Sequence, residues 1–80
     1  MRSDNAQKAA ALTAAGVQKL DGGDAAGAAQ CFHQALEAFD AFAPAHYQLG
    51  RALERLGRHD AARAEFARAQ QLNPALVPPR

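Results

Sequence analysis

One pattern of residues occurs twice along this chain, at a spacing of 34 residues. Five residues recur at this spacing: Gly16, Gly23, Ala28, Phe32 and Ala35 are followed by Gly50, Gly57, Ala62, Phe66 and Ala69. A fixed period of this length is typical of helical repeat arrays, in which each repeat packs against its neighbours. Such arrays build surfaces that hold other chains, so the repeat constrains function as well as fold.

The composition and the capping residues predict an all-α fold for the 80 residues, which suffice for one small domain or part of a larger protein. Asp24 is expected to cap the second helix, Pro44 to lie in the first turn of the third, and Gly57 to end it. The predicted helices span residues 4–20, 25–39, 44–56 and 60–72, with an extended tail over 75–80. The loops are so short that consecutive helices must fold back antiparallel.

Gly16 and Gly50 fall in the middle of predicted helices, where Gly costs about 1 kcal/mol relative to Ala. Because this cost recurs at the same place in both copies, we expect a close approach between helices there. Phe32 and Phe66 are then predicted to be large core side chains, each four residues after a small Ala.

The second copy is the more complete of the two. It carries His46, Leu49, Gly50, Leu53, Gly57, Ala62, Phe66, Ala69 and Pro74. This pattern resembles a tetratricopeptide repeat over residues 43–76, with His46 in place of the usual aromatic residue. Residues 9–42 resemble a looser copy, which departs from the family at Leu12, Ala15, Lys19 and Asp40. The expected organisation is therefore an extension of the first helix over 1–8, repeats over 9–42 and 43–76, and a Pro-rich tail over 77–80.

The resemblance implies two stacked helix–turn–helix units, forming a short right-handed α-solenoid, with a concave groove lined by the first helix of each unit. That groove would bind a peptide or protein segment of a partner. Carried over by position, its residues are Thr13, Val17, Leu20, Asp21, Tyr47, Gln48, Arg51, Glu54 and Arg55. Some family members clamp a carboxylate with Lys and Asn, but Thr13 and Val17 stand at those positions here. Arg51 and Arg55, one turn apart, could attract an acidic peptide, or could simply form a solvated face with Glu54.

No pattern of catalytic, cofactor-binding or metal-ligating residues stands out in the sequence. Cys31 and His33 are two residues apart on a helix, so they point in different directions and cannot share a metal. Ser3 and Thr13 have no base nearby in the sequence, and Gly22-Gly23 lacks the rest of a nucleotide-binding fingerprint. We therefore predict that the chain is not an enzyme and has no cofactor or metal.

Nucleic-acid binding and membrane insertion are both disfavoured. The net charge of +1 and a pI near 8.0 fall short of the basic footprint of a nucleic-acid-binding domain. No apolar run approaches the length of about 20 residues needed to cross a bilayer. The N-terminus lacks the apolar core of a signal peptide, and a single Cys excludes an internal disulfide, so a cytoplasmic location is expected.

Self-assembly is the main alternative function. Two repeats are fewer than the three or so that such arrays generally need, so Ala and Leu surface is expected on the last helix unless the tail covers it. Residues 1–40 and 41–80 carry net charges of −2 and +3, which favours head-to-tail contact. These features predict a homo-oligomer, most simply a dimer, or a chain that is the N-terminal fragment of a larger repeat protein.

Overall fold

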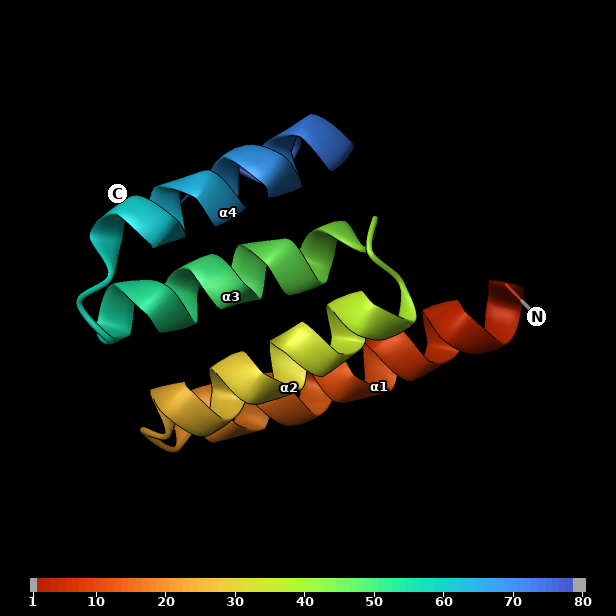
Figure 1. The fold of residues 1–80 in the computed structure, drawn as a ribbon, viewed down its shortest axis with the longest axis horizontal. Helices are drawn as coiled ribbons and strands as arrows, with labels where there is room; N and C mark the ends of the chain where they lie inside the picture. The colour runs from red at the N-terminus through yellow and green to blue at the C-terminus, as the bar shows by residue number, and fades with distance from the viewer. Residues whose placement is uncertain (1, 79–80) are drawn as a thin grey trace.

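The computed structural model describes residues 2–78, which form four helices joined by short loops (Figure 1). The helices are α1 (Arg2–Asp21), α2 (Ala25–Ala38), α3 (Ala43–Arg55) and α4 (His59–Leu72). They pair into two antiparallel hairpins, α1–α2 and α3–α4, and α3 packs against both helices of the first hairpin. The predicted all-α fold of stacked helix hairpins is therefore confirmed.

The ends of the helices follow the capping residues read from the sequence. The carboxylate of Asp24 accepts a hydrogen bond from the backbone N–H of Gly27 at 2.8 Å, which begins α2. Gly23 and Gly57 have φ of +91° and +79°, a left-handed conformation that favours Gly. The next residue in each case donates its N–H back into the helix, Asp24 to Lys19 and Arg58 to Leu53, and this terminates α1 and α3.

Most helix boundaries differ from the prediction by one or two residues, and the starts of α1 and α4 involve charged side chains. The first helix begins at Arg2, two residues earlier than predicted, and Asp4 lies within its first turn. The fourth begins at His59, and Arg58 precedes it without a side-chain hydrogen bond to the helix. Asp60 instead pairs with Arg63 on the exposed surface of α4. These shifts of one or two residues are the usual uncertainty at helix ends.

The repeated Gly residues allow the close approach that their positions predict. A Cβ atom placed on Gly16 would lie 2.5 Å from Cε1 of Phe32, and one on Gly50 would lie 2.7 Å from Cε1 of Phe66. Both rings are buried, with Phe32 fully inaccessible and Phe66 4% exposed. Each hairpin is thus held together by a Phe ring lying against a Gly backbone, as the sequence predicted.

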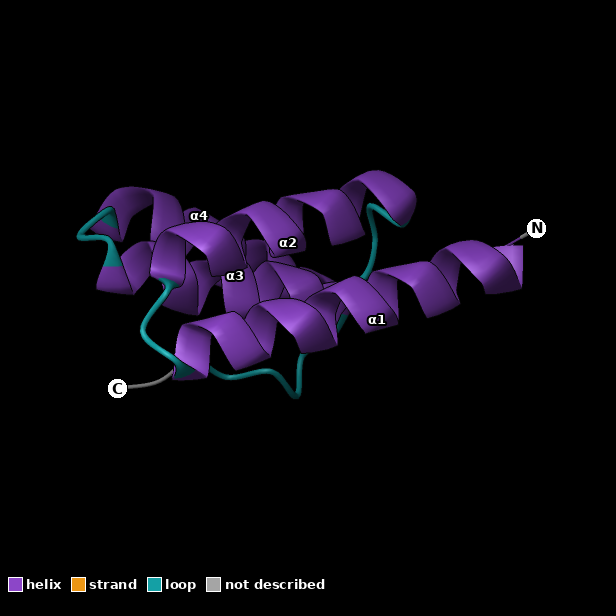
Figure 2. Ribbon diagram, turned by 90° about the horizontal axis from the view of Figure 1, so that it is seen from below, coloured by secondary structure: helices purple, strands orange, loops and turns teal. Residues whose placement is uncertain are grey.

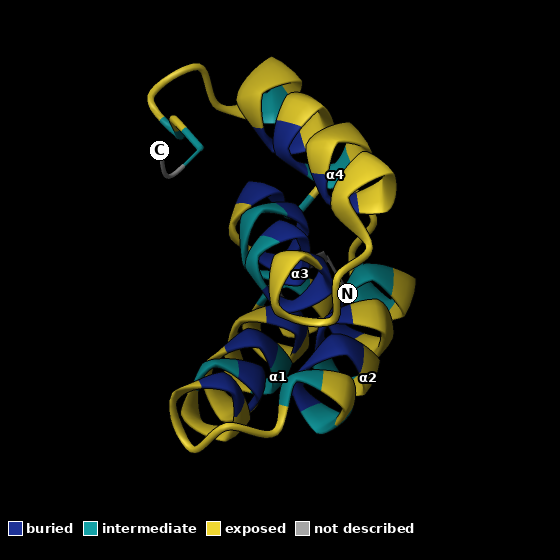
Figure 3. Ribbon diagram, turned by 90° about the vertical axis from the view of Figure 1, so that its left-hand side faces the viewer, coloured by how far each residue is buried: buried dark blue, intermediate teal, exposed yellow. Residues whose placement is uncertain are grey.

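One continuous core joins the two hairpins. It contains Leu20 of α1, Phe32 of α2, Leu49 of α3 and Phe66 of α4, while a smaller cluster of Ala9, Ala35 and Ala45 lies apart from it. Viewed along the hairpins, α1 and α3 lie on one side of the molecule and α2 and α4 on the other (Figure 3). The first helices of the two hairpins therefore share a face, as a groove between them requires.

The outer surface of α4 is more polar than the sequence analysis expected. Ala61, Ala64 and Ala67 are exposed, but Arg63, Arg68, Gln70 and Gln71 are exposed among them, and Leu72 is only half-exposed. The tail after α4 turns at Asn73, whose side chain accepts a hydrogen bond from the N–H of Ala75 at 3.1 Å. Figures 2 and 3 show the tail folding back on the side of the molecule that carries α3, instead of extending away.

Candidate functional site

We call the surface of α3 formed by Tyr47, Gln48, Arg51 and Glu54 the α3 face. The spacing of Tyr47, Arg51 and Glu54 places them on one stripe of the helix, with Gln48 beside it. Three of the four side chains are half-buried, and Glu54 is exposed. The α3 face is therefore a surface that a partner can reach.

Two contacts hold the α3 face in position. The ring of Tyr47 packs edge-on against Phe66, with 5.5 Å between centroids and 65° between planes. The guanidinium of Arg51 donates a hydrogen bond from Nη1 to Oε1 of Gln48 at 3.0 Å. Because these side chains are already ordered, a ligand would lose less conformational entropy on binding to them.

The residues predicted on α1 do not all reach the surface. Leu20 is fully buried in the core between the hairpins, so its prediction as a partner-binding residue is wrong. Thr13 is 7% exposed, and its hydroxyl donates to the carbonyl of Ala9 at 2.7 Å, so it too belongs to the interior. Val17 is half-buried against the core, while Asp21 at the end of α1 is exposed.

Arg55 has a structural contact that the sequence did not indicate. Its Nη1 donates to the backbone carbonyl of Leu20 at 2.7 Å, across 35 positions of the chain. This carbonyl also accepts from the N–H of Gly23 at 3.0 Å, so Arg55 is its second donor, and its charge complements the helix dipole at the end of α1. Arg55 therefore ties α3 to α1.

His46 is a buried polar residue whose role was not predicted. It is 7% exposed, with Nδ1 at 2.7 Å from Oε1 of Glu65 and Nε2 at 2.8 Å from the carbonyl oxygen of Asp40. The ring joins the α2–α3 loop to α4 through α3. The sequence does contain a signal for this contact, because the positions of His46 and Glu65 are occupied in the first copy by Leu12 and Cys31.

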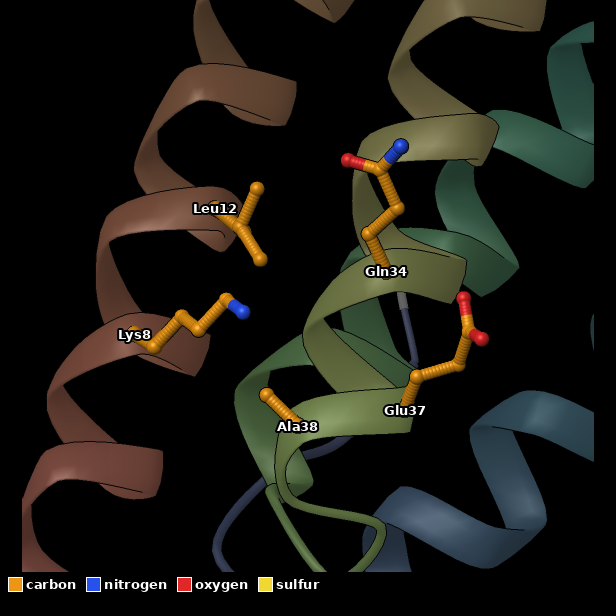
Figure 4. Close-up of a pocket in the computed structure, with 5 residues that line it drawn as sticks. All are labelled: Lys8, Leu12, Gln34, Glu37 and Ala38. Atoms are coloured by element: carbon orange, nitrogen blue, oxygen red, sulfur yellow. The ribbon is translucent and has the colours of Figure 1, made fainter.

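A shallow pocket of about 330 Å³ lies between α1 and α2, away from the α3 face (Figure 4). It is lined by Lys8 and Leu12 of α1 and by Gln34, Glu37 and Ala38 of α2. In Figure 4 the Lys8 side chain extends toward α2, whereas the carboxylate of Glu37 points away from it. None of these residues was predicted as a binding residue, and their mixed polarity indicates no particular ligand.

The residues considered for metal binding do not form a metal site in the described part of the chain. Within residues 2–78 there is no group of three or more His, Cys, Asp or Glu side chains placed to hold a metal ion. Cys31 is half-buried and His33 is exposed. None of the helices described is both long and apolar enough to cross a bilayer.

Comparison with known protein families agrees with this geometry. Residues 43–76 match the family model of the tetratricopeptide repeat. A search of curated proteins found no match to the chain. Residues 9–42 lie outside the matched segment, but they form the same kind of hairpin with the same Gly–Phe contact. The α3–α4 hairpin therefore matches the tetratricopeptide repeat, and the α1–α2 hairpin precedes it with the same internal packing.

Proposed function

We propose that this chain is a protein-interaction module that holds a segment of a partner protein against the α3 face and the exposed end of α1. Tetratricopeptide repeats generally mediate protein–protein interaction and are typically non-catalytic scaffolds. The observation that carries the proposal is the α3 face itself, where an aromatic ring, an amide and a guanidinium lie half-exposed and already ordered.

The chemistry of the α3 face favours a partner segment with an acidic residue next to an apolar one. The guanidinium of Arg51 can bind a carboxylate in a bidentate manner, and the Tyr47 ring beside it offers apolar contact area. Glu54 and Asp21 would repel a segment that is acidic along its whole length. A surface this short supports a dissociation constant on the order of micromolar.

The test compares two charge reversals on immobilised protein. Arg51→Glu alters the α3 face, whereas the matched control Arg63→Glu alters an exposed Arg on the outer surface of α4. Proteins retained from a cell extract by the unmodified chain should be lost with Arg51→Glu and kept with Arg63→Glu. If both variants lose the retained proteins equally, binding depends on overall charge. If both variants keep them, the α3 face is not the binding surface.

Self-assembly remains the second candidate, and it is supported by apolar side chains on the surface. Phe39, Leu56 and Val77 are 39%, 40% and 60% exposed. Together with the opposite net charges of the two halves, they would favour a homodimer. Sedimentation equilibrium at about 100 μM, far above micromolar dissociation constants, should give twice the mass of one chain. A mass of one chain at that concentration would rule the dimer out.

A further inference from the structure

The surface on which another hairpin can stack differs between the two hairpins. In the first hairpin, the core that it shares with α3 includes or contacts five apolar side chains: Val17, Leu20, Ala25, Ala29 and Leu36. The residues 34 positions later form the surface that we call the end face: Arg51, Glu54, His59, Arg63 and Gln70. Of these, Arg51 is half-buried and the others are exposed. An apolar docking surface on one hairpin is therefore replaced by a polar surface on the next.

The tail leads toward the end face through the same turn that leads into α3. Phe39 and Asn73, which follow α2 and α4, have φ/ψ of −151°/95° and −146°/98°. The N–H of Phe42 donates to the carbonyl of Phe39 at 3.2 Å. In the same way, the N–H of Leu76 donates to the carbonyl of Asn73 at 3.0 Å. Figure 3 shows the tail on the side of the molecule that carries α3, so the backbone takes the course that would bring a helix to the end face.

A helix like α3 brings no polar partner to the end face. It meets the first hairpin through three side chains without hydrogen-bonding atoms: Ala45, Leu49 and Ala52. The same side chains packed on the end face would remove the guanidinium of Arg51 and the carboxylate of Glu54 from water. The ion pair between Arg63 and Asp60 would lose its water as well. Burying charged groups without new partners is strongly unfavourable, so such a helix is excluded by the side chains of the end face and not by the path of the chain.

We propose that Arg51, Glu54 and Arg63 close the stack at the second hairpin, because they prevent a further helix hairpin of this kind from packing on the end face. Each stands where the first hairpin has an apolar residue, so these three positions distinguish a hairpin that accepts a neighbour from one that does not. The end face overlaps the α3 face at Arg51 and Glu54, and it stays open to a partner that supplies polar groups of its own. Stacking is measured without any partner, so its test is independent of the binding test above.

The test adds a third hairpin in register with the first two. A second copy of residues 43–76 is joined after residue 76, which continues the 34-residue period. One extended chain keeps the end face unmodified. Another carries Arg51→Val, Glu54→Leu and Arg63→Ala in the original hairpin only. These changes install the residues that the first hairpin has at the equivalent positions: Val17, Leu20 and Ala29.

A control chain makes polar side chains apolar outside the end face. It carries Arg68→Val and Gln71→Leu on α4 and the same added hairpin. The equivalent residues on α2, Gln34 and Glu37, stay exposed although α3 packs on that hairpin, so these two positions do not receive a neighbour. The control therefore separates stacking on the end face from a general increase in apolar surface.

The melting temperature of each extended chain is compared with that of the same chain without the added hairpin. With the three substitutions on the end face, the added hairpin should stack and raise the melting temperature by about 5 °C or more, whereas the unmodified and control chains should gain less than about 2 °C. An equal gain in the unmodified chain, an equal gain in the control chain, or no gain in any of the three would overturn the proposal.

The unmodified extended chain gives a second measurement that does not depend on the substituted protein folding. Amide hydrogen exchange should be fast throughout the added hairpin and slow in the core of the original four helices, because a repeat without a packed neighbour has little stability of its own. Protection of the added hairpin equal to that of α3 and α4 would show that it stacks in spite of the charges, and would overturn the proposal.

Discussion

The two hairpins of this molecule share their interior and differ at their edges. Inside each, a Phe ring packs against a Gly at the same spacing, Phe32 against Gly16 and Phe66 against Gly50. At the edge, Leu20 of α1 is fully buried, whereas Glu54, at the equivalent position of α3, is exposed. The difference arises because α3 covers the first hairpin on that side, while no helix of the described chain covers the second.

The same contrast holds at other equivalent positions of the two hairpins. Ala29 of α2 is buried at the junction, and its equivalent on α4 is the exposed Arg63. Val17 packs against the core, and its equivalent is Arg51 of the α3 face. A position within a repeat therefore carries an apolar residue where another hairpin packs on it and a polar residue where it stays accessible.

The largest effect is expected from removing the Phe ring that each hairpin packs against a Gly. Phe32→Ala and Phe66→Ala should each destabilise the chain by about 3–5 kcal/mol, because each removes a ring packed on a Gly and leaves a cavity. The loss should be greater for Phe32, which is fully buried, than for Phe66, which is 4% exposed. Urea denaturation followed by circular dichroism measures both, and a cooperative transition at the original midpoint would contradict the core assignment.

A smaller effect is expected when the Gly partners are changed. Gly16→Ala and Gly50→Ala place a Cβ atom 2.5 Å and 2.7 Å from the facing ring. The overpacking cost of about 1–3 kcal/mol exceeds the gain of about 1 kcal/mol from better helix propensity, so both variants should be less stable. Gly22→Ala is the control, because its Cβ would meet only backbone atoms at ordinary contact distances of 3.5 and 3.6 Å. Thermal melts in which Gly50→Ala is stabilising would show that the helices can separate at little cost.

The smallest effect on stability is expected at the residues that precede α2 and α4, because only the first of them caps its helix. Asp24→Ala removes the side-chain acceptor at the start of α2 and should cost about 1 kcal/mol. Arg58→Ala, at the equivalent position before α4, should change the free energy of unfolding by less than about 0.5 kcal/mol, because Arg58 makes no such bond. Equal losses in thermal denaturation would mean that the cap of α2 contributes nothing of its own.

Much of the fold could be predicted because its signals are local or repeat in the sequence. The type and position of Gly57 predict a helix end, and those of Asp24 predict a cap. The contacts of Gly16 and Gly50 followed from an otherwise unfavourable residue recurring in mid-helix. The candidate site was predicted less well. Tyr47, Gln48 and Arg51 are accessible as expected, but Leu20 and Thr13 are buried.

The missed features depend on residues far apart in the chain. Arg55 is bonded to the carbonyl of Leu20, 35 positions away, and nothing in the sequence around Arg55 distinguishes it from Arg51. His46 is bonded to Glu65, 19 positions away, and only the paired change from Leu12 and Cys31 hints at this contact. The tail likewise folds back through a turn at Asn73 instead of extending.

The sequence by itself determined the helices, the turns between them and the Gly–Phe packing inside each hairpin, because backbone conformation and short-range packing depend on residue type and spacing. Only the tertiary structure decided which side chains remain accessible on the face shared by α1 and α3. Burial there depends on the hairpin stacked alongside, which takes Leu20 into the core, engages Arg55 at the end of α1 and leaves Tyr47 and Arg51 partly accessible.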